Sequence, residues 1–276
     1  MGNKISLGAL FSKPDVRDYK ASTKNTEFLD EFELSMPKVK NQKQVGSCVA
    51  HALSTVVEYF NKKESGTYKQ MSTGYIYGNR RLTLYKGSGM YTKDAIKTVA
   101  QYGDVPNVLF PVNVEVPEAI EKFEEEVDKI EESGYFFKFN EYFKLKDAAS
   151  IKTSLMENGP AIMTMHWFDD INVVDGVMQT KCVKSKNTSG HCMVIYGWNE
   201  KGWKVRNSWG RNWGNKGNVI IPYEVPMKEV WGIKDAAADS SLVVKKPFST
   251  KFGAKLAKVL NKVVLFFYDL FNKTQD

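Results

Sequence analysis

The sequence predicts an α+β protein in which a helical lobe comes first and a β-sheet lobe follows. Before Pro160 the apolar residues recur at helical spacing, and after it short β-rich runs alternate with Gly and Asn turns. Helices and strands that are segregated along the chain are typical of α+β folds. The chain has 276 residues, of which 42% are hydrophobic and 26% charged. It is therefore long enough for a large core, and its composition excludes wholesale disorder.

The helical lobe is expected to contain a central helix that begins at Cys48. Apolar residues from there to Phe60 form one helical stripe, and the small, turn-forming segment 44–47 precedes it. The other elements expected in this half are a helix over 71–85, a loop over 86–90, a helix over 94–102 that ends at Gly103, and an acidic helix over 117–132 with Ile120, Phe123, Val127 and Ile130 on one face. The charges of the acidic helix are most simply a solvated face.

The sheet lobe is expected to contain strands over 161–167, 191–198, 202–209 and 218–223. From these elements we expect four segments. They are an N-terminal arm (1–35), a helical lobe (36–112), a segment with the acidic helix and the β lobe (113–240), and a basic amphipathic helix at the C-terminus (241–276).

The net charge of +7 belongs mainly to the last segment. Residues 241–276 hold seven lysines and two aspartates, which leaves about +2 for the rest of the chain, while 113–134 holds nine acids and two lysines. A nearly neutral body does not indicate a nucleic-acid-binding protein.

The targeting signals are few. The N-terminus lacks the apolar stretch of a secretory signal, and no run of 18 apolar residues exists. The opening MGNKIS matches the short myristoylation pattern, which also arises by chance. Three cysteines, Cys48, Cys182 and Cys192, make no disulfide framework and show no metal-binding spacing. We therefore expect a cytoplasmic location, with membrane association through the C-terminal helix as an alternative.

Cys48 is the first candidate for chemistry. A free cysteine is most often a small buried apolar residue. This one lies at the predicted first turn of a helix, where the partial positive charge favours the nucleophilic thiolate. A nearby histidine could pair with the thiolate and later donate a proton to a leaving amine.

Three histidines compete for that role. His51 lies three residues along the same helix and could be a partner or a packed neighbour. His166 alternates with apolar residues and is more simply a core or edge histidine. His191 opens a strand directly after Gly190, where it could face a cleft, but periodicity alone does not decide its role.

Three motifs then resemble the papain family of cysteine peptidases. They are QKQVGSCVA around Cys48, the Gly190-His191 pair, and NSWGRNWGNKG beginning at Asn207. Their order and intervals match the family, and the pattern also extends to GSGM at 87–90, LFPV at 109–112 and NGPAIMTM at 158–165. The resemblance covers roughly 36–235. It implies a two-lobe fold, with an antiparallel β-barrel-like lobe and the active-site cleft between the lobes.

The resemblance also implies roles. Cys48 would attack the peptide carbonyl, His191 would act as acid and base, and Asn207 would orient the imidazole. Gln42 and the Cys48 backbone N–H would form the oxyanion hole. Trp209 would cover the bond between His191 and Asn207. The substrate backbone would pair with the loop formed by Gly87, Ser88, Gly89 and Met90, and Gly190 would border the cleft. The resemblance implies neither a metal nor another cofactor.

The sequence departs from the family in three places. Val49 replaces the aromatic residue after the nucleophile, and Val45 replaces a cysteine, as expected in a reducing compartment. Only 47 residues precede Cys48, so we expect a bacterial- or phage-type member without the long inhibitory propeptide. Activity would then be constitutive, or limited by location, or blocked by an arm that occludes the cleft. Met90, Ala161 and Trp231 are expected to border a specificity pocket; no acid is obvious there, so we expect an apolar preference.

The C-terminal segment predicts an amphipathic helix. Its apolar stripe is Phe252, Leu256, Val259, Val263, Phe267 and Leu270, flanked by lysines. Residues 251–271 could pack on the body, bind a membrane surface, or dock to a protein partner.

Two functions follow from the sequence. The first is a monomeric cysteine endopeptidase with a polypeptide substrate and no nucleic-acid partner. The second is a papain-fold peptide-binding or scaffold protein with weak or no catalysis.

Overall fold

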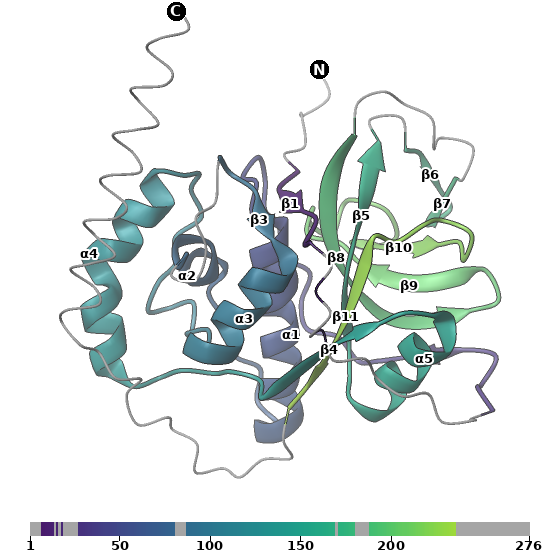
Figure 1. Ribbon diagram of the computed structural model, residues 1–276, viewed down its shortest axis with the longest axis horizontal. Helices are drawn as coiled ribbons and strands as arrows, with labels where there is room; N and C mark the ends of the chain where they lie inside the picture. The colour runs from purple at the N-terminus through teal and green to yellow at the C-terminus, as the bar shows by residue number, and fades with distance from the viewer. Residues whose placement is uncertain are drawn as a thin grey trace, which may run out of the picture.

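The computed structural model of the protein describes residues 7–13, 15, 18, 27–80, 87–168, 171–179 and 188–235. The C-terminal helix expected over 241–276, the MGNKIS motif and Cys182 lie outside these residues. The described residues form a helical lobe and a sheet lobe that meet along α1 (Cys48–Ser65) and β8 (Thr188–Asn199), as Figure 1 shows. The predicted α+β fold with two lobes is confirmed.

The central helix α1 begins at Cys48, as predicted, and is five residues longer than its apolar stripe. Thirteen of its eighteen residues are buried, which is typical of a helix covered on most sides. It ends where Gly66 adopts a left-handed conformation and donates its N–H to the carbonyl of Lys62.

Four further helices surround α1 and the sheet. They are α2 (Thr73–Gly78), α3 (Thr92–Tyr102), α4 (Glu118–Ser133) and α5 (Ala148–Glu157). Helix α2 ends at Gly78, so it is shorter than the helix predicted over 71–85. Helix α5, which the periodicity did not predict, begins at a capping box formed by Asp147 and Ser150.

The acidic helix α4 belongs spatially to the helical lobe. It packs on α2, where the Phe123 ring lies 5.3 Å from that of Tyr75. Phe123 and Ile130 are buried while most of the acids are not, which agrees with the predicted solvated face. Grouping by sequence placed this helix with the β lobe, but its apolar stripe pairs it with α2.

The sheet lobe is built around the long strand β8. The strand order is β4-β11-β5-β8-β9-β10-β7-β6, with β1 and β2 also paired to β8 and β3 paired to β1. The bounds are β1 Ala9–Leu10, β2 Phe32–Glu33, β3 Met90–Tyr91, β4 Glu141–Leu145, β5 Ala161–Phe168, β6 Val173–Val174, β7 Val177–Met178, β9 Gly202–Arg206, β10 Asn218–Ile221 and β11 Glu229–Lys234. The four predicted strands are present as β5, β8, β9 and β10. Strand β9 ends at Arg206, three residues earlier than predicted.

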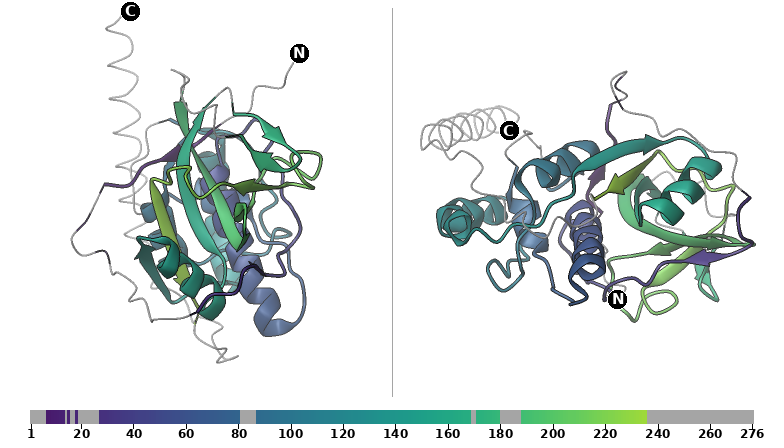
Figure 2. Two further views of the ribbon diagram at one scale, coloured as in Figure 1. Left: turned by 90° about the vertical axis from the view of Figure 1, so that its right-hand side faces the viewer. Right: turned by 90° about the horizontal axis from the view of Figure 1, so that it is seen from below.

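The N-terminal arm crosses the seam between the lobes. Strand β1 runs parallel to β3 of the helical lobe and antiparallel to β8 of the sheet lobe. Figure 2 shows from two further directions that α1 lies beside the curled sheet. One apolar core cluster includes Ala9, Cys48, Met90, Cys192 and Trp231, so it draws on the arm and both lobes.

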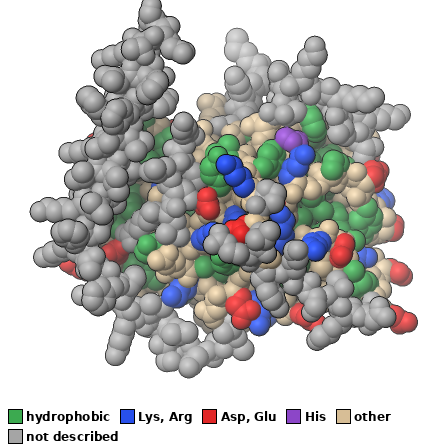
Figure 3. Space-filling view, in the orientation of Figure 1, with side chains coloured by type: hydrophobic (Ala, Val, Ile, Leu, Met, Phe, Trp, Pro, Cys, Tyr) green, Lys and Arg blue, Asp and Glu red, His purple; other side chains and the backbone are tan. Residues whose placement is uncertain are grey.

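The described surface carries mixed charge. On the face shown in Figure 3, acidic and basic side chains are interspersed among polar and apolar ones. Among the residues that the structure describes, none of the helices combines the length and the apolarity required to span a bilayer.

Candidate active site

Cys48 is the first residue of α1, and its side chain is fully buried. The preceding residue, Ser47, makes no side-chain cap to the helix, so the helix N-terminus still favours negative charge near the sulfur. Burial has the opposite and larger effect, and it raises the pKa of the Cys48 thiol to about 11. The backbone N–H groups of Cys192 and Gly8 point at this sulfur and partly offset the effect of burial.

His191 lies on β8 and is also fully buried. Its Nε2 is 2.8 Å from Oδ1 of Asn207, and its ring stacks on Trp209 with 4.5 Å between centroids and an angle of 16°. Among the described residues its Nδ1 has no hydrogen-bond partner. Burial lowers the pKa of His191 to about 4, although the bond to Asn207 favours the protonated ring.

Asn207 is fixed by the turn that follows β9. Its N–H donates to the carbonyl of Gly217 at 3.0 Å, and its Oδ1 also accepts the N–H of Ser208 at 2.7 Å. The indole of Trp167 meets the His191 ring edge-on at 5.3 Å and Trp209 at 4.9 Å. The imidazole is thus enclosed by aromatic rings that exclude water from its bond to Asn207.

Gln42 is buried and tied to the same turn. Its Oε1 accepts the hydroxyl of Ser208 at 2.6 Å, and its backbone N–H donates to the carbonyl of Ser208 at 2.8 Å. Its Nε2 donates to the carbonyl of Val45 at 2.9 Å. The loop before Cys48 and the turn after Asn207 are therefore held together through Gln42.

The arm occupies the space beside the Cys48 sulfur. The carbonyl of Gly8 accepts the N–H of Met90 at 2.8 Å, and Ala9 pairs with Gly190. A Cβ on Gly8 would overlap the carbonyl oxygen of Gly46, and a Cβ on Gly190 would overlap the carbonyl oxygen of Ala9. Only glycine fits at these two contacts.

Charged and polar side chains anchor the rest of the arm. Ser12 donates its N–H and its hydroxyl to Oε1 of Glu229, at 3.2 and 3.3 Å, and its hydroxyl accepts the N–H of Lys93 at 3.0 Å. The Lys93 ammonium forms ion pairs with Asp15 and Asp18. Burial alone would lower the pKa of Lys93, but pairing with the two aspartates raises it.

The loop 87–90 lies on the other side of the arm. Met90 pairs with Ala9, and the Leu10 side chain packs against Gly89. The carbonyl of Ser88 accepts the hydroxyl of Tyr77 at 2.9 Å. The structure thus gathers Gln42, Cys48, His191, Asn207, Trp209, Gly190 and the loop 87–90 around one segment of the arm.

The other two histidines lie elsewhere. The His51 Nδ1 lies 3.0 Å from the carbonyl oxygen of Ser47 and 3.2 Å from its hydroxyl, inside the base of α1. Half-buried His166 meets the Phe11 ring at 4.5 Å. Of the two alternatives for His51, a partner of Cys48 or a packed neighbour, the structure favours the packed neighbour.

Sequence reasoning missed two acids at this site. Glu229 binds Ser12 of the arm, although no acid was expected near Met90 and Trp231. Glu115 accepts the hydroxyl of Tyr77 at 2.6 Å and the N–H of Gly46. Neither acid lies in a motif. The register of β11 on β5 places Glu229, and the packing of its loop places Glu115.

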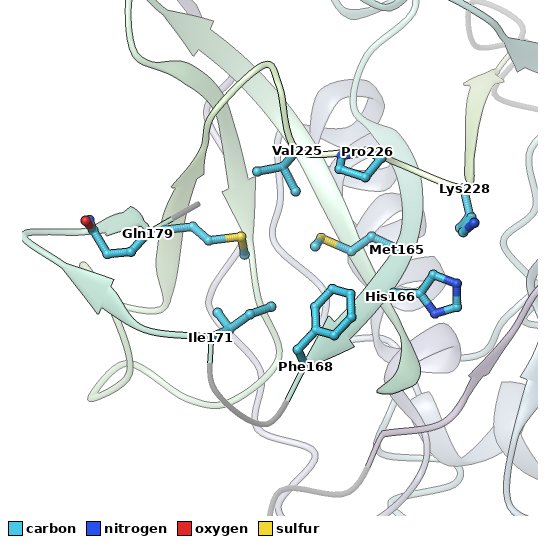
Figure 4. Close-up of a pocket in the computed structure, with 9 residues that line it drawn as sticks. Met165, His166, Phe168, Ile171, Gln179, Val225, Pro226 and Lys228 are labelled. Atoms are coloured by element: carbon cyan, nitrogen blue, oxygen red, sulfur yellow. The ribbon is translucent and has the colours of Figure 1, made fainter. Parts of the chain in front are cut away.

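A small cavity of about 70 Å³ lies in the sheet lobe (Figure 4). Its lining is mostly apolar and includes Met165, Phe168, Ile171 and Val225, with His166 and Lys228 at one side. None of the candidate catalytic residues lines it. Within the described part of the chain, no group of three His, Cys, Asp or Glu side chains could hold a metal ion.

The chain is similar to cysteine proteases in sequence. An uncharacterized peptidase C1-like protein of Acanthamoeba polyphaga mimivirus is 27% identical over 200 residues, which cover 67% of this chain and 64% of that protein. A cysteine protease of Blomia tropicalis is 24% identical over 221 residues, covering 74% of this chain and 62% of that protein. The chain thus spans somewhat less than two thirds of the length of these relatives.

Solved structures share the fold. Xylellain, a cysteine protease from Xylella fastidiosa, superposes with a TM-score of 0.69 at 21% identity, covering 85% of this chain and 97% of that one. A procathepsin B of Trypanosoma congolense superposes with a TM-score of 0.67 at 17% identity, covering 84% and 87%. The family described as papain family cysteine protease matches residues 27–238. This chain belongs to the papain family of cysteine proteases.

Proposed function

We propose that the protein is a cysteine endopeptidase that hydrolyses polypeptides. The observation that carries this proposal is the bond of 2.8 Å between His191 Nε2 and Asn207 Oδ1, enclosed by Trp209. The residue after His191, Cys192, points its backbone N–H at the sulfur of Cys48, which begins a helix. An oriented imidazole next to a helix-start cysteine is the arrangement that nucleophilic catalysis requires.

The reaction would proceed in two steps. In acylation, the Cys48 thiol gives its proton to His191 and its sulfur attacks the peptide carbonyl carbon. His191 then passes that proton to the leaving amine as the C–N bond breaks and a thioester forms. In deacylation, His191 takes a proton from water, which attacks the thioester and releases the acid and the Cys48 thiol. The Cys48 N–H and the Gln42 amide would donate to the oxyanion, once Nε2 of Gln42 turns from Val45.

We propose further that the arm keeps this enzyme latent. With the arm in place, burial favours a neutral thiol and a neutral imidazole, because the pKa values are about 11 for Cys48 and about 4 for His191. The arm presents the Gly8 N–H to the sulfur, while the Gly8 carbonyl is turned to the N–H of Met90. It therefore occupies the cleft without being placed for attack.

A glycine substitution tests both proposals in the full chain. Gly8→Val should exclude the arm, because any Cβ there overlaps Gly46. We expect faster iodoacetamide labelling of Cys48 and faster hydrolysis of a fluorogenic peptide library than in the unsubstituted chain. Lys13→Val is the matched control, because Lys13 lies in the same arm and is exposed. Cys48→Ala should abolish hydrolysis.

The two proposals fail in different ways. Equal labelling and activity in Gly8→Val, Lys13→Val and the unsubstituted chain would refute latency but not peptidase activity. Rapid Cys48 labelling in Gly8→Val without hydrolysis of any library peptide would instead favour the peptide-binding or scaffold function.

A further inference from the structure

A second buried cysteine, Cys192, lies beside Cys48. Within the described part of the chain the cysteines are Cys48 and Cys192, and both are free and at most 1% exposed. The backbone N–H of Cys192 points at the Cys48 sulfur. The start of α1 and the strand β8 therefore bring two thiol-bearing residues into direct contact.

The Cys192 side chain lies on the side of β8 that Cys48 packs against. His191 and Cys192 are consecutive in β8, so their side chains lie on opposite faces of the strand. His191 stacks on Trp209, which packs against a core cluster of the sheet lobe. Cys192 belongs instead to the core cluster that contains Cys48. The aromatic rings around the imidazole therefore do not separate the two thiols.

The two sulfurs are close enough to affect each other. Burial is the largest cause that raises the pKa of the Cys192 thiol, and the neighbouring Cys48 is the next. A Cβ atom lies two bonds from the backbone nitrogen of its own residue. The Cys48 sulfur, which accepts the Cys192 N–H, thus lies near the carbon that bears the other sulfur. Thiols in such contact can meet the short Cβ separation of a disulfide, about 3.5–4.5 Å.

The surroundings of the Cys192 sulfur are partly polar. Hydrogen bonds join this sulfur to the hydroxyls of Thr164 and Thr92, which lie 2.9 Å from each other. These hydrogen bonds oppose the effect of burial on the pKa of Cys192, because they stabilise a thiolate. A cysteine that only fills space in a core needs no such partners.

We propose that Cys192 is a resolving cysteine, which forms a reversible disulfide with Cys48 after a hydroperoxide has oxidised Cys48. In the first step the Cys48 sulfur attacks one peroxide oxygen and the O–O bond breaks. A sulfenic acid forms, and the thiol proton leaves with the other oxygen as an alcohol or water. In the second step the Cys192 sulfur attacks the Cys48 sulfur, the S–O bond breaks, and water leaves with the Cys192 proton. A dithiol supplies the two electrons and two protons that restore both thiols.

This disulfide would protect Cys48 from permanent damage. A sulfenic acid that meets a second peroxide becomes a sulfinic acid, which thiols do not reduce. Condensation with Cys192 removes the sulfenic acid first. While the arm is in place both thiols are buried, so oxidation belongs to the opened protein. The effect on hydrolysis rests on the proposed peptidase function, whereas the disulfide itself does not.

The test uses the full chain carrying Gly8→Val, with Cys182→Ala and Cys192→Ala as matched variants that each remove one cysteine. After brief exposure to hydrogen peroxide, non-reducing digestion and mass spectrometry should find Cys48 linked to Cys192 in the parent and in Cys182→Ala. Dithiothreitol should then restore hydrolysis in both to the rate of the same protein before oxidation. Cys192→Ala should instead accumulate the Cys48 sulfinic acid and lose its activity permanently. If Gly8→Val does not fold, Lys93→Ala opens the arm in its place.

The outcomes separate this proposal from the proposed function. Equal sulfinic acid and equal recovery in Cys192→Ala and Cys182→Ala would overturn the resolving role, and so would a disulfide of Cys48 with Cys182 alone. A disulfide between Cys48 and Cys192 in a protein that hydrolyses no peptide would support the resolving role and overturn only the peptidase.

Discussion

The imidazoles of His51 and His191 are both buried, and their surroundings give them different properties. His51 has its Nδ1 beside the Ser47 carbonyl within α1, whereas His191 holds Asn207 and leaves its Nδ1 without a partner among the described residues. A ring nitrogen with no protein partner is available for proton transfer, whereas an imidazole packed at the base of a helix contributes to stability. The two histidines should therefore respond differently to substitution.

Asn207→Ala should lower kcat/KM about 10- to 100-fold in the Gly8→Val background, because the His191 ring loses its side-chain hydrogen bond to Asn207 and with it its orientation. Steady-state hydrolysis measures this loss. Asn107→Ala, in the helical lobe, is the control and should leave kcat/KM unchanged. Equal rates in the two variants would contradict the orienting role.

His51 should make unfolding dependent on pH. Burial lowers its pKa to about 3, against 6.5 in the unfolded chain, so the unfolded state binds more protons between these values. The stability that neutral His51 contributes is complete above pH 6.5 and is lost as the pH falls toward 3. At pH 5 the loss is about 2 kcal/mol.

Urea unfolding of the full chain at pH 7.5 and pH 5 measures this effect against His51→Gln. The variant lacks the titrating ring, so its stability deficit relative to the unsubstituted chain should shrink by about 2 kcal/mol at pH 5. A deficit that is the same at both pH values would contradict the assignment. His191 titrates in both proteins and cancels from the comparison.

At the scale of elements, Glu115 joins two loops that face the arm. One of its oxygens accepts the N–H of Gly46, two residues before Cys48, and the other accepts the hydroxyl of Tyr77, which also donates to the carbonyl of Ser88. Burial and the neighbouring Glu115 both raise the pKa of Tyr77, so the phenol stays protonated and keeps donating. Val45 replaces a cysteine of the family beside this position, and these hydrogen bonds hold the loops without a disulfide.

Glu115→Leu should therefore destabilise the chain by about 1–3 kcal/mol, because it leaves the Gly46 N–H without this acceptor and leaves the Tyr77 hydroxyl with the carbonyl of Ser88 alone. Glu115→Gln retains an oxygen for the Gly46 N–H and should lose less. Denaturant unfolding measures both variants. Equal losses in the two would show that the side-chain volume matters rather than the hydrogen bonds.

Lys93 of α3 anchors the arm through its ion pairs, which gives a prediction about how firmly the arm is held. Lys93→Ala removes the ion pairs to Asp15 and Asp18, and charge-assisted bonds of this kind contribute about 1.5–3 kcal/mol. Iodoacetamide labelling of Cys48 should therefore accelerate about 10- to 100-fold in the full chain. Lys97→Ala, on the same helix, serves as the control; labelling as slow as in that control would show that Lys93 does not hold the arm.

At the scale of the whole molecule, the sequence predicts what depends on local periodicity and motif. The central helix from Cys48, the acidic helix α4 and strands β5 and β8 follow from apolar spacing, and the motifs mark Gln42, Cys48, His191 and Asn207. Helix α5 was missed because its few apolar residues show no clear period. Strand β11 was missed as well; its six residues, EVWGIK, include a charged residue at each end and a glycine. Glu229 could not be predicted as a site residue, since only the register of β11 on β5 places it beside Thr164.

The position of the arm could not be predicted from periodicity or motif either, because tertiary packing decides it. Its residues carry no periodic signal, and only the folded lobes create the space between β3 and β8 that Gly8 and Ala9 fill. Occlusion of the cleft was one of three alternatives that the sequence left open. The described geometry supports it because Cys48 and His191 are fully buried.

Because β1 joins β3 to β8, the arm acts as a ligand that is tethered to its own receptor. A tethered segment keeps the same local concentration however dilute the protein is, on the order of millimolar for short flexible connections. Dilution would therefore not activate the enzyme, and a peptide substrate would have to compete with that local concentration. Any event that cuts or captures the arm would change activity and also remove the strand that bridges the two lobes, so the opened enzyme should unfold at a lower temperature than the closed one.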